Sequence, residues 1–165
     1  MFQELLDLLL DLDGVRQDPR HHPEGDALFH SLQVFRHARR ATRDRQLQAA
    51  ALLHDVGKAH AGADHDVVGA ELLEGLVPPR VCWLVAHHLD LLRAPRETRW
   101  RLRGDPRLRD LEDLRDWDLA GRDPRARVGA PVDALLVLYD DPRDLAVPSP
   151  TVGEPTHDPD EEPLW

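Results

Sequence analysis

Five histidine and aspartate side chains lie at positions where helical spacing turns them toward a protein core. Residues three, four and seven positions apart share one face of a helix, and each candidate has apolar neighbours at such spacings. The candidates, one from each of five expected helices, are His30, His54, His65, His88 and Asp118. Imidazole and carboxylate groups are ligands for divalent metals such as manganese, iron, cobalt, nickel or zinc. The pattern therefore predicts chemistry at a shared metal ion.

A buried imidazole or carboxylate destabilises a core unless it is hydrogen-bonded or paired. Separate hydrogen bonds are one way to satisfy the five groups, and for a single histidine this is the commoner solution. A cation that stabilises all five is the other, and we favour it because five coincidental buried polar groups are improbable in one small domain. On the last of these helices, Asp116 shares its face with Glu112 and Asp113. This spacing selects Asp118 as the inward carboxylate.

The stretch "ALLHDVGKAH", residues 51–60, places Asp55 directly after His54 and holds Lys58, the only lysine beside 20 arginines. Neighbouring helical residues diverge by about 100°, but Gly57, in the position of a C-cap glycine, would let the backbone turn so that both side chains reach one centre. A single lysine in a chain that otherwise uses arginine indicates that this position favours a compact ammonium over a planar guanidinium, with a solvated surface lysine as the alternative.

Arginine is concentrated late in the chain, where 11 of the 20 fall between Arg93 and Arg127. Such a cluster is compatible with a basic rim for a phosphorylated or nucleic-acid substrate. The acids interleaved from Asp105 to Asp123 make a solvated face of salt bridges at least as good an interpretation. Arg122, close after Asp118, is the arginine that we expect to bind substrate.

The elements that must position these residues are helices, because no segment alternates convincingly with period two and few residues are aromatic or β-branched. Asp26 and Asp64 are expected N-caps, and Pro78-Pro79 opens another helix. The expected helices span residues 1–16, 27–41, 44–56, 64–76, 79–89, 107–120 and 132–139. The fold class is therefore predicted to be all-α, a bundle of about six to seven helices.

At this point the residues resemble the HD-domain metal-dependent phosphohydrolases, whose signature "H…HD…D" matches His30, His54-Asp55 and a distal aspartate. The stretch "HHPEGDALFHSLQVFRHA", residues 21–38, is similar to the opening of the HD domain in bacterial CCA-adding tRNA nucleotidyltransferases. "ALLHDVGKAH" looks like the HD-x-G-K core, "DHDVVGAELL" like the next helix, and "RDWDLAGRD", residues 115–123, like the distal segment. The likeness covers residues 20–125, but nothing in the chain resembles the nucleotidyltransferase domain.

The resemblance implies metal ligands at His30, His54, Asp55 and Asp118. Two-metal members of the family imply a second ion at His65 and His88, bridged to the first by Asp55. His87 competes with His88, although His87 shares its face with Arg80 and Trp83. Asp55 and Lys58 would be the catalytic residues, and Lys58 would also bind the substrate phosphate, because an ammonium can meet a phosphate oxygen as a point charge. One or two divalent ions are expected, and the sequence leaves their identity open among Mn, Fe, Ni, Co, Mg and Zn.

Three functions follow from this interpretation. The favoured one is a metal-dependent phosphohydrolase that acts on a nucleotide or a phosphorylated RNA end (a 2′,3′-cyclic phosphodiester, a 2′-phosphate or a phosphomonoester) through a metal-activated water. The second is a non-catalytic metal- or nucleotide-binding sensor or regulatory HD module. The third is a purely structural helical domain whose histidines are satisfied locally.

Composition narrows the setting of the protein. A formal net charge of −10 argues against a general nucleic-acid coat and sequence-specific DNA binding. The single cysteine, Cys82, fits a reducing cytoplasm, and neither a signal peptide nor a membrane span is expected. An HD-type helical domain is expected over residues 1–140. Proline and acids dominate residues 141–165, which we expect to form a disordered tail. The oligomeric state stays open.

Overall fold

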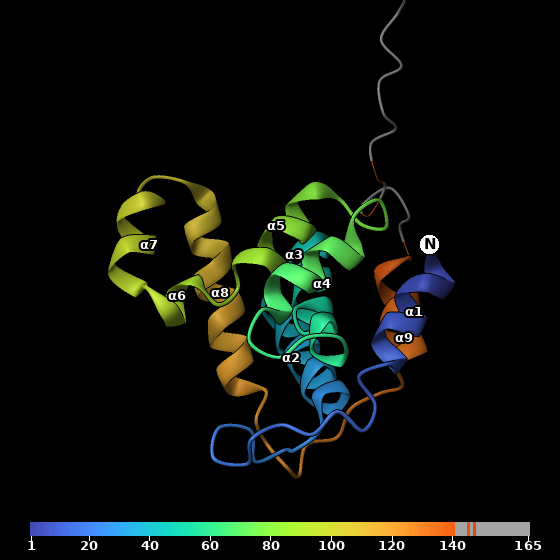
Figure 1. Ribbon diagram of the computed structural model, residues 1–165. Coiled ribbons are helices and arrows are strands. Elements are labelled where there is room, and N and C mark those ends of the chain that lie inside the picture. Colours follow the sequence, from blue (N-terminus) through green and yellow to red (C-terminus); the bar gives the residue numbers. More distant parts are fainter. Residues whose placement is uncertain (141–144, 146, 148–165) are drawn as a thin grey trace, which may run out of the picture.

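The computed structural model describes residues 1–140, 145 and 147. Within these residues there is no strand, only an isolated bridge between Arg16 and Asp26, so the all-α prediction is confirmed (Figure 1). The helices are α1 (Phe2–Leu10), α2 (Ala27–Ala41), α3 (Arg45–Leu53), the 3₁₀-helix η1 (Val56–Ala59), α4 (His65–Leu73), α5 (Pro79–His87), α6 (Asp90–Arg93), α7 (Pro95–Arg101), α8 (Pro106–Ala120) and α9 (Pro131–Leu138).

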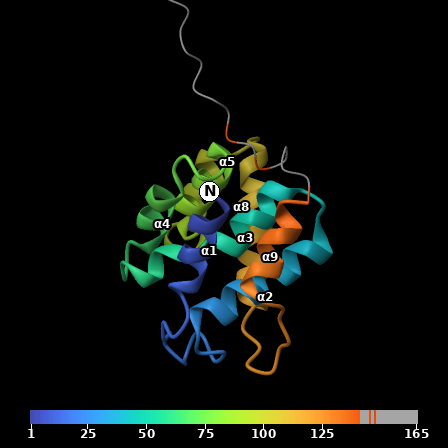
Figure 2. The same ribbon diagram turned by 90° about the vertical axis from the view of Figure 1, so that its right-hand side faces the viewer.

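The apolar faces of the longer helices meet in one leucine- and alanine-rich core. α3 is almost wholly buried, and α2, α5 and α8 pack around it. α1 and α9 lie side by side at one edge (Figure 2), whereas α6 and α7 project at the opposite edge (Figure 1). The predicted boundary at residue 140 stays a prediction, because most of the proposed tail, residues 141–165, lies outside the described residues.

Aspartate side chains cap three of the helices. Asp26 accepts a hydrogen bond from the amide of Phe29 at 2.9 Å, and Asp44 accepts one from the amide of Leu47 at 3.1 Å. Asp64 occupies the N-cap position of α4, but its side chain makes no capping hydrogen bond, so that part of the prediction is wrong. Asp105 caps α8 instead, by accepting from the amide of Arg107 at 2.9 Å.

The expected end of α3 at Gly57 is also wrong. α3 ends at Leu53, His54 is its C-cap, and the chain turns at Asp55, where φ is −105° and ψ is 4°. Gly57 does not have the positive φ of a C-cap glycine. It is required for a different reason, since a Cβ atom there would stand 2.0 Å from the carbonyl oxygen of His65 and 2.7 Å from the amide nitrogen of Gly69.

Substituting Gly57→Ala is therefore expected to lower the free energy of unfolding by about 3 kcal/mol or more, because the clash is with backbone and α4 must move. Urea denaturation measures the effect. Gly62→Ala is the matched control, since a Cβ at Gly62 meets nothing within 4 Å. Equal stability of the two variants would show that η1 and α4 do not need this close approach.

Candidate metal centre

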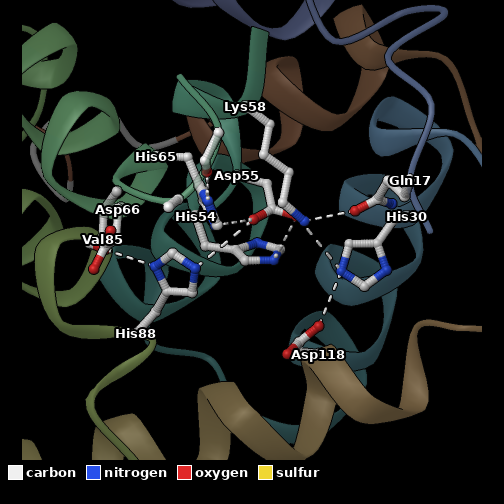
Figure 3. A network of polar contacts seen from close by, with 12 residues as sticks. Gln17, His30, His54, Asp55, Lys58, His65, Asp66, Val85, His88 and Asp118 are labelled. Atoms are coloured by element: carbon white, nitrogen blue, oxygen red, sulfur yellow. Dashed lines mark hydrogen bonds and ion pairs between the residues drawn. The ribbon is translucent and has the colours of Figure 1, made fainter. Parts of the chain in front are cut away.

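Asp55 lies at the centre of the polar cluster and is 1% exposed. Its Oδ2 atom is 3.3 Å from His54 Nε2 and 3.8 Å from His30 Nε2. Its Oδ1 atom is 3.3 Å from His65 Nε2 and 3.7 Å from His88 Nε2. Each oxygen of one carboxylate thus faces its own pair of imidazoles (Figure 3).

Asp118 joins the cluster from α8, with Oδ1 3.0 Å from His30 Nε2. The structure thereby brings together all six residues that the sequence singled out as metal ligands. Two subsets have ligand atoms that all lie within 4.8 Å of one another, which is compact enough to hold an ion. They are His30 with His54 and Asp55, and Asp55 with His65 and His88.

The rings are oriented by hydrogen bonds from their other nitrogen. His54 donates from Nδ1 to the carbonyl of Ala51 at 3.0 Å. In the same way, Nδ1 of His65 donates to the carbonyl of Gly62 at 2.8 Å, and Nδ1 of His88 donates to the carbonyl of Val85 at 2.7 Å. A carbonyl only accepts, so Nδ1 carries a proton in each ring and Nε2 is the nitrogen that can bind a metal.

The Nε2 atoms of the cluster face carboxylate oxygens. Nε2 of His30, His54 and His65 is buried without a hydrogen-bond partner, and each lies within 4 Å of the Asp55 carboxylate. Imidazole lone pairs and carboxylate oxygens that converge in a buried site repel one another unless a proton or a metal cation lies between them. This donor set fits a divalent metal with imidazole and carboxylate ligands.

The alternatives left open by the sequence point elsewhere. His87 is half-buried and its Nδ1 lies 2.9 Å from Asp90 Oδ2, away from Asp55. Asp116 is exposed. The helical spacing of apolar residues therefore predicted correctly that His88, and not His87, points inward. It made the same correct choice of Asp118 over Asp116.

Lys58 reaches the same centre from η1. Its Nζ atom is 2.6 Å from Asp55 Oδ2 and donates to Gln17 Oε1 at 2.5 Å (Figure 3). Burial alone would raise the pKa of Asp55, but the charges of His54 and Lys58 hold it well below its ordinary value. Lys58 is thus a half-buried partner of the central carboxylate and lines the cleft above it.

Arg122 is held at the rim of the cluster. It donates to the carbonyl of His21 at 3.0 Å and to both oxygens of Asp118 at 3.3 Å. Five of the other ten arginines of the 93–127 segment form ion pairs, which join Arg93 to Asp66, Arg99 to Glu112, Arg101 to Asp90, Arg107 to Asp105 and Arg109 to Asp113. The salt-bridged interpretation of that segment fits these contacts better than a basic rim does.

Glu24 is the residue that sequence reasoning missed. Its side chain is fully buried, with Oε1 2.8 Å from Nδ1 of His22 and 2.9 Å from Nδ1 of His30. Burial alone would lower the pKa of His30, but the Asp118 and Glu24 carboxylates raise it to about 9. Glu24 lies in a turn without helical periodicity, so spacing gave no signal for it. Only its place between His22 and His30 in the chain hinted at the contact.

Substituting Glu24→Gln is expected to weaken metal affinity about 10- to 100-fold, because a carboxylate on the far nitrogen fixes the ring and raises its basicity. Titration of EDTA-treated protein with Mn²⁺ measures the change. Glu4→Gln, on the exposed side of α1, is the control. Unchanged affinity in Glu24→Gln would mean that the Gly121 carbonyl, 3.0 Å from His30 Nδ1, suffices to orient the ring.

His88 is expected to make the metal-free protein sensitive to acid. Burial, together with the charge of His54, lowers the pKa of His88 from 6.5 to about 4. The unfolded chain therefore binds more protons here between these pH values, and the contribution to stability, complete above pH 6.5, is lost as the pH falls toward 4. Urea denaturation of EDTA-treated protein should show this decline, and His88→Asn should reduce it. A decline of equal size in His88→Asn would assign the effect to other groups.

A cleft of about 640 Å³ opens over the cluster. Its walls include the segment from Val15 to Asp18, residues 88–89 just after α5, and one face of α8. Asp55, Lys58 and Asp118 all line it, so the central carboxylate is buried yet reachable from one side. A volume of this size is typical of small-ligand sites.

The fold and the buried His/Asp cluster define a class of protein. The sequence matches the HD domain family over residues 28–122, which is more than half of the chain. The chain therefore belongs to the HD domain family. Members of this family bind divalent metals, and the cluster around Asp55 could hold one.

Relatives match this HD region. The chain is 54% identical over 48 residues to the Multifunctional CCA protein of Methylococcus capsulatus, covering 29% of this chain and 11% of that protein. It is 39% identical over 82 residues to the Multifunctional CCA protein of Halorhodospira halophila, covering 43% of this chain and 20% of that protein. A Bifunctional uridylyltransferase/uridylyl-removing enzyme of Rhodospirillum rubrum is 36% identical over 80 residues, covering 43% of this chain and 7% of that enzyme.

The matched region is thus a fifth or less of each of these three relatives. The resemblance to CCA-adding enzymes noted in the sequence is confirmed for the HD region alone. None of the helices in the described residues is long and apolar enough to cross a membrane.

Proposed function

We propose that this chain is a divalent-metal-dependent phosphohydrolase acting on a nucleotide or a phosphorylated RNA end. One observation carries the proposal: the two oxygens of Asp55 face two separate pairs of imidazole Nε2 atoms at the floor of an open cleft. A site that only stabilises a fold is usually closed, whereas a catalytic site leaves a side open to substrate.

His30, His54, Asp55 and Asp118 would hold the first ion. His65 and His88 would hold a second one, with Asp55 shared between the two. A divalent cation held there supplies Lewis acidity, which brings the pKa of a water molecule toward neutrality and polarises a phosphoryl oxygen.

The other residues of the cleft position the substrate. Lys58, at 18% side-chain exposure, would present its ammonium to a phosphoryl oxygen as negative charge develops there. Arg122 would hold the Asp118 carboxylate and offer its remaining donor capacity to a phosphate at the rim. The substrate classes that we propose are 2′,3′-cyclic phosphodiesters, 2′-phosphates and phosphomonoesters, in accord with the likeness to CCA proteins in this region.

The test combines metal analysis with a substrate screen. Purified protein is assayed for bound metal, and then with 2′,3′-cyclic nucleotides, nucleoside 2′-phosphates and chromogenic phosphate esters in Mn²⁺, Ni²⁺, Co²⁺ or Mg²⁺. Hydrolysis that EDTA abolishes and one of these ions restores supports the proposal. Stoichiometric metal binding with no turnover of any of these substrates would instead favour a sensor or regulatory HD module.

A further inference from the structure

A second cleft, of about 360 Å³, lies on a different part of α2 from the metal centre. The last two turns of α2, the segment 127–130 and the first turns of α9 form its walls. None of its lining residues lines the cleft over Asp55. The segment that leads from α8 to α9 passes close to α2 on this side of the molecule (Figure 2).

Four arginines surround this second cleft, namely Arg36, Arg39, Arg40 and Arg127. Although the chain carries 31 acidic residues, no described residue forms an ion pair with any of these four guanidinium groups. Asp133 is the one acidic residue among the lining residues. Four cations that the described part of the chain leaves without an ion pair create a locally positive potential around one depression in an otherwise acidic protein.

Arg36 carries a second sign of an unfilled site. One of its terminal nitrogens donates to the carbonyl of Arg127, but its Nε atom is buried without a hydrogen-bond partner. A buried donor that is left unpaired destabilises the protein unless a ligand or water completes it. An anion in the cleft would supply the missing acceptor.

The floor of the cleft is apolar. Leu32 and Phe35 from α2 and Val137 from α9 line it, together with Val128. A guanidinium can bind a phosphate through two parallel hydrogen bonds and can also stack on a planar ring. An apolar floor beside such groups suits a ligand with one apolar, planar end and one phosphate end.

We propose that this second cleft binds a nucleotide, with its phosphate on the arginines and its base on the apolar floor. The ligand is either a free nucleoside phosphate or one nucleotide of an RNA strand, because both present the same chemistry. The site goes beyond the proposed hydrolase activity and does not depend on it, since none of its residues belongs to the metal centre.

Binding is tested on the full-length, EDTA-treated protein, so that hydrolysis plays no part. Isothermal titration with 5′-AMP and with a short single-stranded RNA compares the wild type with Arg39→Glu/Arg40→Glu. The matched control is Arg96→Glu/Arg103→Glu, which makes the same charge change at two exposed arginines that have no ion pair among the described residues. Circular dichroism verifies that both variants fold.

The α2 double variant is expected to bind at least about tenfold more weakly than the control, because it loses two charge-assisted contacts. Loss of 5′-AMP binding would identify a free nucleotide as a ligand. Loss confined to the RNA, with a shallower dependence of affinity on salt, would identify a strand. If the two double variants bound both probes equally well, the proposal would be overturned, whatever the outcome of the hydrolase assay.

Discussion

Replacing Asp55 by Asn is expected to remove metal binding and phosphohydrolase activity together. Each oxygen of Asp55 faces two imidazole nitrogens, so one amide substitution withdraws the shared negative charge from both pairs. Metal-ion catalysis supplies several kcal/mol of transition-state stabilisation, and each 1.36 kcal/mol is a factor of ten. The rate with Mn²⁺ should therefore fall by at least about 10³-fold.

The control for Asp55→Asn is Asp116→Asn, the same change on an exposed face of α8. Elemental analysis of both proteins should show metal lost from the first variant and retained in the second. Asp118→Asn should fall between them, because Asp118 faces His30 alone among the four imidazoles. Full metal content in Asp55→Asn would show that the imidazoles bind the ion without a bridging carboxylate.

Replacing Lys58 by Arg is expected to lower kcat about 10²- to 10³-fold, the range seen when one preorganised hydrogen-bond donor is lost. The Lys58 ammonium fits between Asp55 Oδ2 and Gln17 Oε1, at 2.6 and 2.5 Å. A planar guanidinium is larger and cannot occupy this space in the same way. Steady-state kinetics on a phosphomonoester, in saturating Mn²⁺, measure the change.

Gln17→Ala is the companion variant to Lys58→Arg, since it removes one contact of the Lys58 ammonium but keeps the charge of Lys58. A smaller loss of kcat is expected there, with unchanged metal content. Wild-type rate and substrate affinity in Lys58→Arg would contradict the proposed role, and any cation at this position would then suffice.

Much of the fold could be predicted from local signals. The bounds of α2 matched the expected range, because Asp26 supplies a clear cap and the apolar stripe is regular. α6 and α7 could not be predicted, since their sequence is rich in arginine and they are short. Ion pairs such as Arg93 with Asp66 hold this region, and such pairs depend on side chains distant in sequence.

The residues of the candidate site likewise fall into those that local sequence signals predict and those that depend on tertiary contacts. Helical spacing found the four inward histidines and Asp118, because burial of a helix face leaves a periodic pattern. Glu24 lies in a turn, and its burial depends on how α2 and the 15–26 segment meet. Gly57 was selected for a backbone turn, yet the structure needs its missing side chain for the approach of α4. Only tertiary contacts could reveal either role.

Three of the four central histidines are oriented by a local contact, since each ring donates a hydrogen bond to the carbonyl three residues earlier in the chain. His30 differs, because its ring is steered by Gly121, 91 positions away, and by Glu24. The half of the centre formed by His65 and His88 can thus be assembled from nearby segments during folding. The half that contains His30 forms only after α8 has docked. Detachment of α8 would therefore disrupt the ligand geometry around His30 and leave that of His65 and His88 intact.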